Sequence, residues 1–299
     1  MSITKQEIID GFRALQLRIT SQLEAEDGVG HFREDAWERP GGGGGFSRII
    51  EAGAVIEKGG VNFSAVHGHL PENITKDLGV DDAAFLATGV SIVIHPNSPM
   101  VPIIHMNVRY FEMENGTWWF GGGIDLTPHY VVADDAQFFH AALKTTCDKT
   151  DGAFYPKFKQ WADDYFYIKH RKETRGIGGI FFDRLNSESG YTKQELWDFV
   201  LAVGDTFAPT YRALMARHKE EVFTDAQRQW QLLRRGRYVE FNLVYDKGTK
   251  FGLDTDGRIE SILMSLPTLA SWVYDHKVEP NSEEEKTLSL LQKGVNWVD

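Results

Sequence analysis

Polar side chains with catalytic potential alternate along two neighbouring apolar segments. Ser91 and His95 lie four residues apart in the first segment. His105, Asn107 and Arg109 occupy alternate positions of the second. Because successive side chains of a β-strand point to opposite faces, each set shares one face. An arginine can hold a carboxylate and a histidine can transfer a proton near neutral pH, but a sheet with one solvated face explains the same pattern. These residues alone leave a catalytic and a structural interpretation open.

Three consecutive glycines precede an aspartate further along the chain. Residues 121–123 are glycines that follow two tryptophans, and Asp125 comes two residues later. Glycines allow the backbone to approach a ligand closely or to adopt positive φ angles. An acid held after such a loop can act as a base or anchor a ligand. On the sequence alone, capping the turn before Pro128 is the favoured role for Asp125.

Several histidines raise the question of a metal site. His95, His105, His140 and His170 are chemically sufficient for a divalent cation. They are widely spread, however, and form no H-x-x-x-H or H-E-x-x-H pattern. His140 lies on the apolar stripe of a predicted helix, and His170 lies at a predicted helix end, where a cation is favoured. The spacing therefore favours structural roles over metal binding.

Further anion-binding groups lie elsewhere in the chain. Residues 234–237 include three arginines, and such a run usually forms a solvated face. Residues 256–258 are predicted to form a turn that places Arg258 at the start of a strand, where it would suit a second carboxylate. The glycines at 41–45 could bind an anion through their amides. No nucleotide-binding glycine loop and no Gly-x-Ser-x-Gly elbow are present, which weakens phosphate transfer and serine hydrolysis as functions.

The composition limits the possible functions. The chain has 299 residues, 42% of them hydrophobic, so it can bury a sizeable core. Its net charge of -11 disfavours nucleic acids and anionic membranes as partners, and no segment approaches the roughly 20 apolar residues of a membrane span. The single cysteine, Cys147, is interpreted as a packed thiol. The first dozen residues contain acids and no long apolar run, which predicts no targeting peptide and a cytoplasmic location.

The apolar spacing predicts which elements position these residues. An opening helix is indicated by Ile8, Phe12, Leu15, Ile19 and Leu23. Strands are predicted at 47–51, 54–58, 61–66, 89–95, 103–112, 118–120 and 177–182. Helices are predicted from 134 to about 146, from 156 to about 170, and after capping boxes at Thr192 and Thr224, with Pro209 bending or restarting the first of these two. Strands then return at 238–245, 250–253 and 258–265, and Ser282 caps a last helix.

The order of these elements indicates the fold class. Strands at both ends with helices between them argue against a regular βαβ alternation. The sequence therefore predicts an α+β fold with one mostly antiparallel sheet covered by helices. The chain shows no internal repeat and no long linker.

Motifs over nearly the whole chain resemble the aerobic, oxygen-dependent coproporphyrinogen-III oxidase family. The matching segments include Glu-Asp-Ala-Trp (34–37), Gly-Val-Asn-Phe (60–63), His-Met-Asn-Val-Arg-Tyr-Phe (105–111), Trp-Trp-Phe-Gly-Gly-Gly-Ile-Asp-Leu-Thr-Pro (118–128), Tyr-Phe-Tyr-Ile-Lys-His-Arg (165–171), Arg-Gly-Ile-Gly-Gly-Ile-Phe-Phe-Asp (175–183), Arg-Arg-Gly-Arg-Tyr-Val-Glu-Phe-Asn (234–242) and Arg-Ile-Glu-Ser-Ile-Leu-Met-Ser-Leu-Pro (258–267). Long matches in this order are far more specific than a single glycine loop.

The resemblance implies a fold, a partner and a reaction. The fold is a large, flat antiparallel sheet flanked by helices on both sides, as a single domain over residues 1–299. The implied assembly is a homodimer whose interface includes roughly residues 238–273. The implied reaction converts two propionates of coproporphyrinogen III into vinyl groups, consumes O₂, and releases CO₂ and hydrogen peroxide. It gives protoporphyrinogen IX in haem biosynthesis, and it needs no organic cofactor because the reduced pyrrole supplies the electrons.

The resemblance also implies roles for single residues. Arg109 and Arg258 anchor propionates, and Asp125 holds or deprotonates the pyrrole N–H groups. His105 is the implied proton donor. The further substrate-contacting positions are Ser91, Asn107, Val108, Asp256 and Gly257. The family histidines proposed as ligands of a divalent cation match His95, His105, His140 and His170; a cofactor-free mechanism competes with that proposal, and dimer packing is an alternative role for His170.

Two other functions compete with this one. A non-catalytic tetrapyrrole carrier explains the arginines, glycines and aromatic residues, but it gives no reason for Asp125 and His105. A histidine-ligated metal hydrolase accounts for the histidines, and its activity would depend on the metal.

Overall fold

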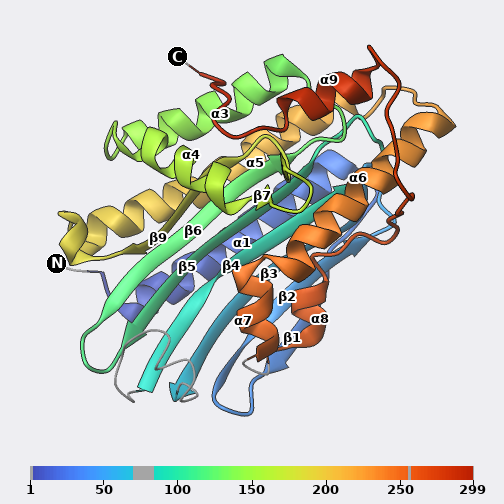
Figure 1. Cartoon of the computed structure of the whole chain (residues 1–299). Helices are drawn as coiled ribbons and strands as arrows, with labels where there is room; N and C mark the ends of the chain where they lie inside the picture. Colours follow the sequence, from blue (N-terminus) through green and yellow to red (C-terminus); the bar gives the residue numbers. More distant parts are fainter. Residues whose placement is uncertain (1–2, 70–83, 255–256, 299) are drawn as a thin grey trace.

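The computed structural model describes residues 3–69, 84–254 and 257–298 (Figure 1). Its strands are β1 (Arg33–Glu38), β2 (Gly43–Glu51), β3 (Ile56–His69), β4 (Ala84–Pro96), β5 (Ile103–Met113), β6 (Trp118–Thr127), β7 (Tyr167–Ile168), β8 (Glu173–Thr174) and β9 (Gly179–Leu185). Its helices are α1 (Lys5–Asp27), α3 (Ala133–Asp148), α4 (Phe154–Tyr165), α5 (Lys193–His218), α6 (Asp225–Val244), α7 (Lys247–Asp254), α8 (Ile259–Leu263) and α9 (Glu283–Leu290), with a 3₁₀ turn at Ser187–Ser189.

Seven strands form one sheet in the order β1–β2–β3–β4–β5–β6–β9, and every neighbouring pair is antiparallel. The first six strands follow one another in the sequence. β9 joins the edge of the sheet beside β6 only after α3, α4 and the separate β7–β8 pair. The predicted α+β class with one large antiparallel sheet is confirmed.

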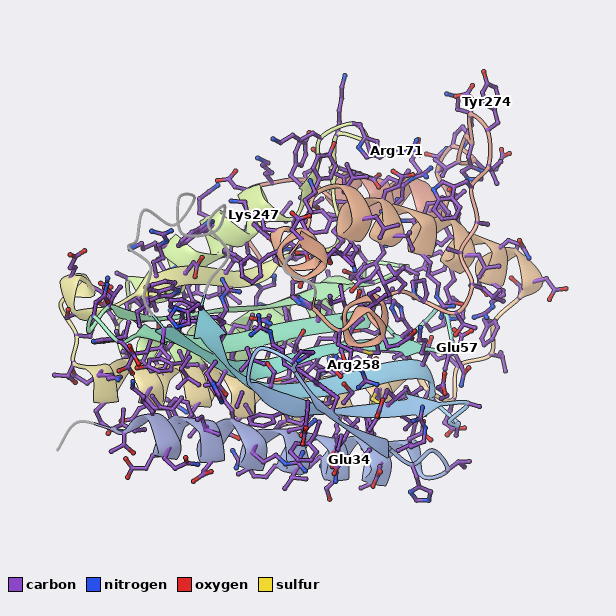
Figure 2. All side chains as sticks on the ribbon, turned by 90° about the horizontal axis from the view of Figure 1, so that it is seen from below. Glu34, Glu57, Arg171, Lys247, Arg258 and Tyr274 are labelled. Carbon is purple, nitrogen blue, oxygen red and sulfur yellow. The ribbon has the colours of Figure 1, made fainter. Side chains whose placement is uncertain are left out.

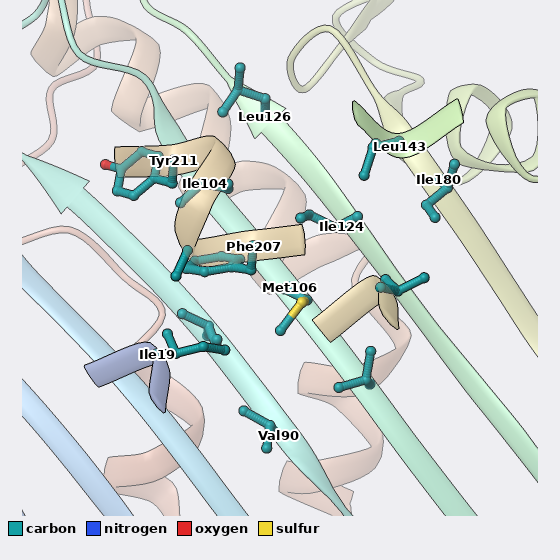
Figure 3. Packing of buried hydrophobic residues seen from close by; sticks show 14 of the residues in the cluster. Ile19, Val90, Ile104, Met106, Ile124, Leu126, Leu143, Ile180, Phe207 and Tyr211 are labelled. Carbon is teal, nitrogen blue, oxygen red and sulfur yellow. The ribbon is translucent and has the colours of Figure 1, made fainter. Parts of the chain in front are cut away.

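One face of the sheet packs against α1 and α5 through a continuous apolar core. On β5, the side chains that point to these helices are those of Ile104, Met106 and Val108, and all three are fully buried. Figure 3 shows Ile104 and Met106 beside Phe207 of α5. Burial of an aliphatic side chain contributes about 1.5–3 kcal/mol, so this face holds the sheet and its helices together.

The opening helix forms as its spacing predicts. Thr4 caps α1 by accepting a hydrogen bond from the Glu7 amide, and the Glu7 carboxylate accepts one from Thr4 in return. The five predicted apolar residues are at most 1% exposed. The helix ends at Gly28, whose φ of 78° suits glycine.

The opposite face of the sheet is polar, and α8 lies against it. The Ser261 hydroxyl of α8 is 2.7 Å from the Ser47 hydroxyl of β2, and the Ser261 carbonyl accepts a hydrogen bond of 3.0 Å from Asn62 of β3. Figure 2 shows Arg258 on this side of the sheet and Glu34 on the side of α1. Helices therefore flank both faces, as the resemblance implies.

The C-terminal third differs from the prediction. The strands predicted at 238–245, 250–253 and 258–265 are wrong, because these segments lie largely in α6, α7 and α8. Arg258 accordingly stands at the N-cap of α8 rather than at the start of a strand.

The stripe of buried residues along α6 explains this difference. The capping box of Thr224 starts the helix. Trp230, Leu233, Tyr238 and Phe241 follow at spacings of three to five residues and are at most 5% exposed. The aromatic and β-branched residues near Tyr238 favour a strand by propensity, but burial of the helical stripe outweighs that weak preference.

Several predicted boundaries also shift. The strands expected at 54–58 and 61–66 are one strand, β3, and the strand expected at 118–120 continues through three glycines as β6. Pro209 lies within α5 without ending it. The helix expected from 156 to about 170 is α4, which stops earlier, before β7.

Candidate active site

The two predicted polar rows meet on the face of the sheet opposite to α1. The pairing of β4 with β5 places Ser91 opposite Asn107. The pairing of β5 with β6 places Asp125 opposite His105. The glycines before Asp125 lie inside β6 and not in a loop, and none of them has a positive φ. Strand register therefore brings imidazole, amide and carboxylate groups together.

His105, Asp125 and Arg175 form a chain of hydrogen bonds that runs from the polar face into the interior. His105 Nδ1 lies 2.8 Å from Asp125 Oδ1. Arg175 Nη2 donates to both oxygens of Asp125 at 2.8 Å, and Arg175 Nε adds a hydrogen bond of 3.3 Å. The side chains of Asp125 and Arg175 are 1% and 2% exposed, whereas that of His105 is 22% exposed. His105 is therefore the member of this chain that a ligand can reach.

The buried ion pair keeps Asp125 ionised. Burial acts to raise the pKa of Asp125, but the charge of Arg175 and the hydrogen bond from His105 lower it, and the net pKa lies below its usual value. Burial likewise opposes the charge of Arg175, yet Asp125 raises the pKa of Arg175 overall. Because an ionised carboxylate only accepts hydrogen bonds, His105 Nδ1 carries a proton. Nε2 is the atom of His105 left to exchange protons with a ligand.

Aromatic rings enclose the guanidinium of Arg175. Its central carbon lies 4.4 Å from the ring centre of Phe166, 4.7 Å from Phe241 and 4.8 Å from Tyr238. Arg175 Nη1 also donates a hydrogen bond of 2.7 Å to Asn242 Oδ1. These contacts offset part of the cost of taking the charge out of water. Since three of the four partners belong to α6, this helix orients the arginine.

Arg175 is a site residue to which the sequence analysis assigns no role. It precedes a Gly-Ile-Gly-Gly run that leads into β9, and it belongs to one of the family motifs. Its partner Asp125 lies 50 residues earlier. No spacing rule links two such positions, so only the folded chain identifies the pair.

Arg109 lies beside this chain on β5 and keeps 38% of its side chain exposed. Its Nη2 is 3.0 Å from Asp183 Oδ1, and its Nη1 donates to Asn107 Oδ1 at 3.2 Å. Ion pairs at such exposure contribute roughly 1 kcal/mol or less. A carboxylate ligand can therefore replace Asp183 at little cost.

Arg258 lies on the same face of the sheet as Arg109. It lies beside β1, whereas Arg109 belongs to β5. It forms an ion pair with Asp35 of β1, and its Nη1 has no hydrogen-bond partner within the described part of the chain. Asp35 and Asn107 belong to one cross-strand row and lie four strands apart. Four spacings of about 4.8 Å separate their backbones by about 19 Å. The two arginines can flank a large ligand, but they cannot grip one carboxylate together.

The remaining predicted contact positions differ in what they can offer a ligand. The Val108 side chain is fully buried in the core on the opposite face, so only its backbone is available. The Ser91 side chain is half-buried on the polar face. Gly257 precedes Arg258 and has no side chain to contribute, and Asp256 lies outside the described residues.

Two of the predicted metal-ligating histidines are occupied by other partners. His95 is fully buried, its Nε2 lies 2.8 Å from the Ser265 carbonyl, and burial lowers its pKa to about 3. His140 belongs to α3, where its Nδ1 lies 2.9 Å from the Tyr155 hydroxyl and its Nε2 lies 3.0 Å from the Ile177 carbonyl. Burial lowers the pKa of His140 to about 4. Both nitrogens of His140 are thus used by the protein.

The other two histidines pair with different acids. His105 contacts Asp125, whereas the exposed His170 lies 2.6 Å from Glu240 and 2.9 Å from the Tyr245 hydroxyl. Among the described residues, no three His, Cys, Asp or Glu side chains are grouped so that they could hold a metal ion. The residues therefore do not fit the four-histidine metal centre that the resemblance suggests.

A cavity of about 340 Å³ lies along α6, where its lining includes Arg171, Trp230, Arg234 and Arg237. None of the catalytic, substrate-binding or metal-ligating residues implied by the resemblance lines it. Arg234 and Arg237 belong to the run expected to form a solvated face, but both are buried. Within the described segments, no helix combines the length and apolar character that a bilayer crossing requires.

Comparisons with known proteins agree over most of the chain. A family model described as Coproporphyrinogen III oxidase matches residues 7–297. The oxygen-dependent coproporphyrinogen-III oxidase, chloroplastic, of Glycine max is 49% identical, over 96% of this chain and 77% of that protein. The oxygen-dependent coproporphyrinogen-III oxidase of Drosophila melanogaster is 49% identical, over 95% and 76%. The mitochondrial form of Homo sapiens is 49% identical, over 99% of this chain and 67% of that protein.

Proposed function

The chain belongs to the coproporphyrinogen III oxidase family, and from this membership we propose that it catalyses the oxygen-dependent oxidative decarboxylation of coproporphyrinogen III. Two propionates become vinyl groups, which gives protoporphyrinogen IX on the route to haem. For each propionate, the carboxyl group leaves as CO₂, and O₂ takes up two electrons and two protons to leave as hydrogen peroxide. The observation that carries the proposal is the His105–Asp125–Arg175 chain beside the exposed Arg109.

The polar face provides groups for a substrate with four carboxylates. Arg109 binds one propionate in place of Asp183, with Asn107 held beside it. Arg258, at the far end of the row, binds another through the part of its side chain that stays exposed beside Asp35. Ser91 lines the face between them. The backbone of Val108 and, as the resemblance implies, Asp256 and Gly257 complete the contacts. The separation of the two arginines suits a macrocycle better than a small acid.

The Nε2 atom of His105 exchanges a proton with the bound substrate during the reaction. A positioned histidine accelerates such steps by about 10²–10⁴-fold. Asp125 acts on His105 as a positioning residue, because it is 1% exposed and both its oxygens are engaged. This differs from the direct contact with pyrrole N–H groups that the resemblance implies.

The proposal includes O₂ as the co-substrate, in line with the names of the relatives, which are oxygen-dependent oxidases. The electrons come from the substrate, because a reduced, electron-rich pyrrole can deliver them to O₂. We therefore propose that no organic cofactor takes part.

A homodimer whose interface includes residues 238–273 is also part of the proposal. Large apolar side chains are exposed along this segment: Leu243, Val244, Phe251, Leu253, Ile259, Leu269, Trp272 and Val273. Exposed large apolar side chains that gather in one segment are typical of protein interfaces. Sedimentation of the wild type should give twice the mass of the chain, whereas Trp272→Asp should shift the equilibrium to monomer. A monomeric wild type at micromolar concentration would contradict this part.

The cytoplasmic location and the single-domain organisation over residues 1–299 stay predictions. The Glycine max relative is named as chloroplastic and the human one as mitochondrial, so location differs within the family. Cell fractionation of the native organism would test the first, and limited proteolysis would test the second. The charge of -11 disfavours a nucleic acid as a partner, and this also stays a prediction.

Turnover of coproporphyrinogen III in air and under nitrogen tests the proposed reaction. We expect O₂ uptake and a divinyl product, identified by mass, in air alone. A parallel sample without protein is needed because porphyrinogens oxidise slowly in air to porphyrins that keep all four propionates. Binding without a divinyl product would indicate a tetrapyrrole carrier. Hydrolytic activity that is lost on chelation would indicate the metal hydrolase.

A further inference from the structure

Three aromatic rings form a continuous row across the polar face of the sheet. The rings of Phe85 in β4 and Phe111 in β5 stack with centroids 5.7 Å apart and an interplanar angle of 9°. Phe111 stacks in turn on Trp119 in β6, at 4.2 Å and 24°. We call Phe85, Phe111 and Trp119 the aromatic row. Phe111 and Trp119 are half-buried and therefore retain surface that a ligand can cover.

The aromatic row begins where the candidate active site ends. Phe111 follows Arg109 by two residues on β5, so both side chains lie on one face, about 7 Å apart along the strand. Trp119 lies opposite Phe111 in the register of β5 and β6. Gly121 lies opposite Arg109, and a Cβ atom there would come within 2.9 Å of Arg109 Nε. The missing side chain leaves room for the Arg109 and Asp183 side chains to lie against the backbone of β6.

Guanidinium groups lie at both ends of the aromatic row. The central carbon of Arg39 lies 5.8 Å from the ring centre of Phe85, and that of Arg184 lies 5.7 Å from Trp119. Within the described residues, neither arginine forms an ion pair, in contrast to Arg109. Each ring of the row therefore has one guanidinium beside it, because Arg109 stands next to Phe111.

This arrangement matches the substituents of the substrate. Every pyrrole ring of coproporphyrinogen III carries one methyl group next to one propionate. Resting on the proposed function, we propose that the aromatic row is the subsite that receives methyl groups and excludes carboxylates from their positions. A methyl group laid on stacked rings leaves water favourably. A carboxylate in its place loses its hydration on the ring face, because the guanidinium beside that ring already binds the neighbouring propionate. Phe111 and Trp119 are thus specificity-determining residues.

Discrimination between two porphyrinogens tests the proposal. One is coproporphyrinogen III, and the other is an octacarboxylate that bears an acetate in place of each methyl group. In Phe111→Ala and Trp119→Ala we expect the preference for coproporphyrinogen III, measured as the ratio of the two kcat/KM values, to fall by about tenfold, which corresponds to roughly 1.4 kcal/mol. KM for coproporphyrinogen III should rise, while kcat stays within about twofold. Trp119→Phe should restore most of the preference, and Trp119→Lys should favour the octacarboxylate.

Phe46→Ala is a matched control on the opposite face of the sheet. Phe46 stacks on Phe63 at 6.3 Å and 22°, and Arg13 lies 3.9 Å from its ring centre. Its removal deletes a stacked ring and a cation–π contact, as Trp119→Ala does, but we expect it to leave the preference unchanged. An equal loss of preference in Phe46→Ala, or wild-type preference in a folded Trp119→Ala, would overturn the proposal.

Anaerobic binding separates this proposal from the proposed reaction. Dissociation constants of both porphyrinogens can be measured under nitrogen, where no turnover occurs. If the wild type is inactive in air yet prefers the methyl-bearing ligand through the aromatic row, the proposed reaction fails and the subsite stands. If the wild type is active but Phe111→Ala and Trp119→Ala bind both ligands as the wild type does, the subsite fails alone.

Discussion

At the scale of residues, the candidate site consists of one histidine that a ligand can reach and a buried ion pair that holds this histidine in place. His105 is 22% exposed, while the side chains of Asp125 and Arg175 behind it are 1% and 2% exposed. The ionised carboxylate orients the imidazole by accepting the hydrogen bond from Nδ1. Changes at Asp125 or Arg175 should therefore reach the substrate through His105.

Arg109→Ala should impair turnover far more than folding. The guanidinium is 38% exposed and its ion pair with Asp183 contributes roughly 1 kcal/mol or less, so the free energy of unfolding should change little. Loss of a charge-assisted contact to a propionate should lower kcat/KM by at least about tenfold. Steady-state kinetics and urea unfolding measure the two effects. Asp183→Asn is the control, since it frees Arg109 and should keep most activity; wild-type kinetics in folded Arg109→Ala would remove Arg109 from the site.

His105→Gln and Asp125→Asn should both lower kcat, by about 10²-fold or more, because each abolishes the oriented imidazole. They should differ in stability. Asp125→Asn leaves the buried charge of Arg175 without a counter-ion, which typically costs about 3–5 kcal/mol, whereas His105→Gln retains the ion pair. Turnover and denaturant unfolding of both variants check this. Unchanged turnover in Asp125→Asn would show that the acid is only a structural residue, as the sequence alone favours.

At the scale of elements, α6 completes the site although it is not part of the sheet. It supplies Tyr238, Phe241 and Asn242 around Arg175. The helix also carries Glu240, which binds His170 and Arg171. Through these contacts, α6 connects the segment between β7 and β8 to the Arg175–Asp125 pair.

The contact between the end of α5 and the start of α3 should depend on pH. His218 lies between Asp135 and Glu221. Burial acts to lower the pKa of His218, but its hydrogen bonds to Glu221 and Asp135 raise it overall above the usual 6.5. A pKa that is higher in the folded than in the unfolded state stabilises the fold fully below about pH 6.5, and this stabilisation is lost as pH rises through the folded-state pKa.

His218→Gln should therefore lower Tm more at pH 6 than at pH 9. Calorimetry at both pH values measures the difference, and His31→Gln, at an exposed histidine, is the control for loss of an imidazole. An equal change in Tm at both pH values would show that the charge of His218 does not support this contact.

At the scale of the whole molecule, the sheet divides the chain into an apolar half and a polar half. The face toward α1 and α5 is closed by the core, and the other face gathers the arginines and the His105 chain. An anionic substrate must therefore be attracted locally, since the net charge of -11 repels it at long range.

Activity should survive removal of metal ions. The four candidate histidines bind other groups, and His140 uses both ring nitrogens for Tyr155 and Ile177. After exhaustive chelation we expect kcat to stay within about twofold, and elemental analysis should find far less than one metal per chain. A stoichiometric metal whose removal abolishes turnover, and whose return restores it, would contradict this expectation.

The sequence by itself was sufficient to predict features that depend on a single strand or a single helix. Alternation along β4 and β5 places Ser91, His105, Asn107 and Arg109 on one face, and the spacing from Ile8 to Leu23 predicts α1. These patterns arise from the geometry of the backbone itself, which a sequence displays directly.

Tertiary structure alone decided the rest. Three features depend on contacts between segments distant in the sequence. They are the pairing of Asp125 with Arg175, the separation of the four histidines, and the helical structure of the segments predicted as strands at 238–245, 250–253 and 258–265. Such contacts are selected by burial and charge neutralisation in the packed molecule, which outweigh local propensity. The buried Arg175 binds an aspartate 50 residues earlier in the chain, and rings of α6 enclose its guanidinium, so no spacing along the sequence predicts the pair.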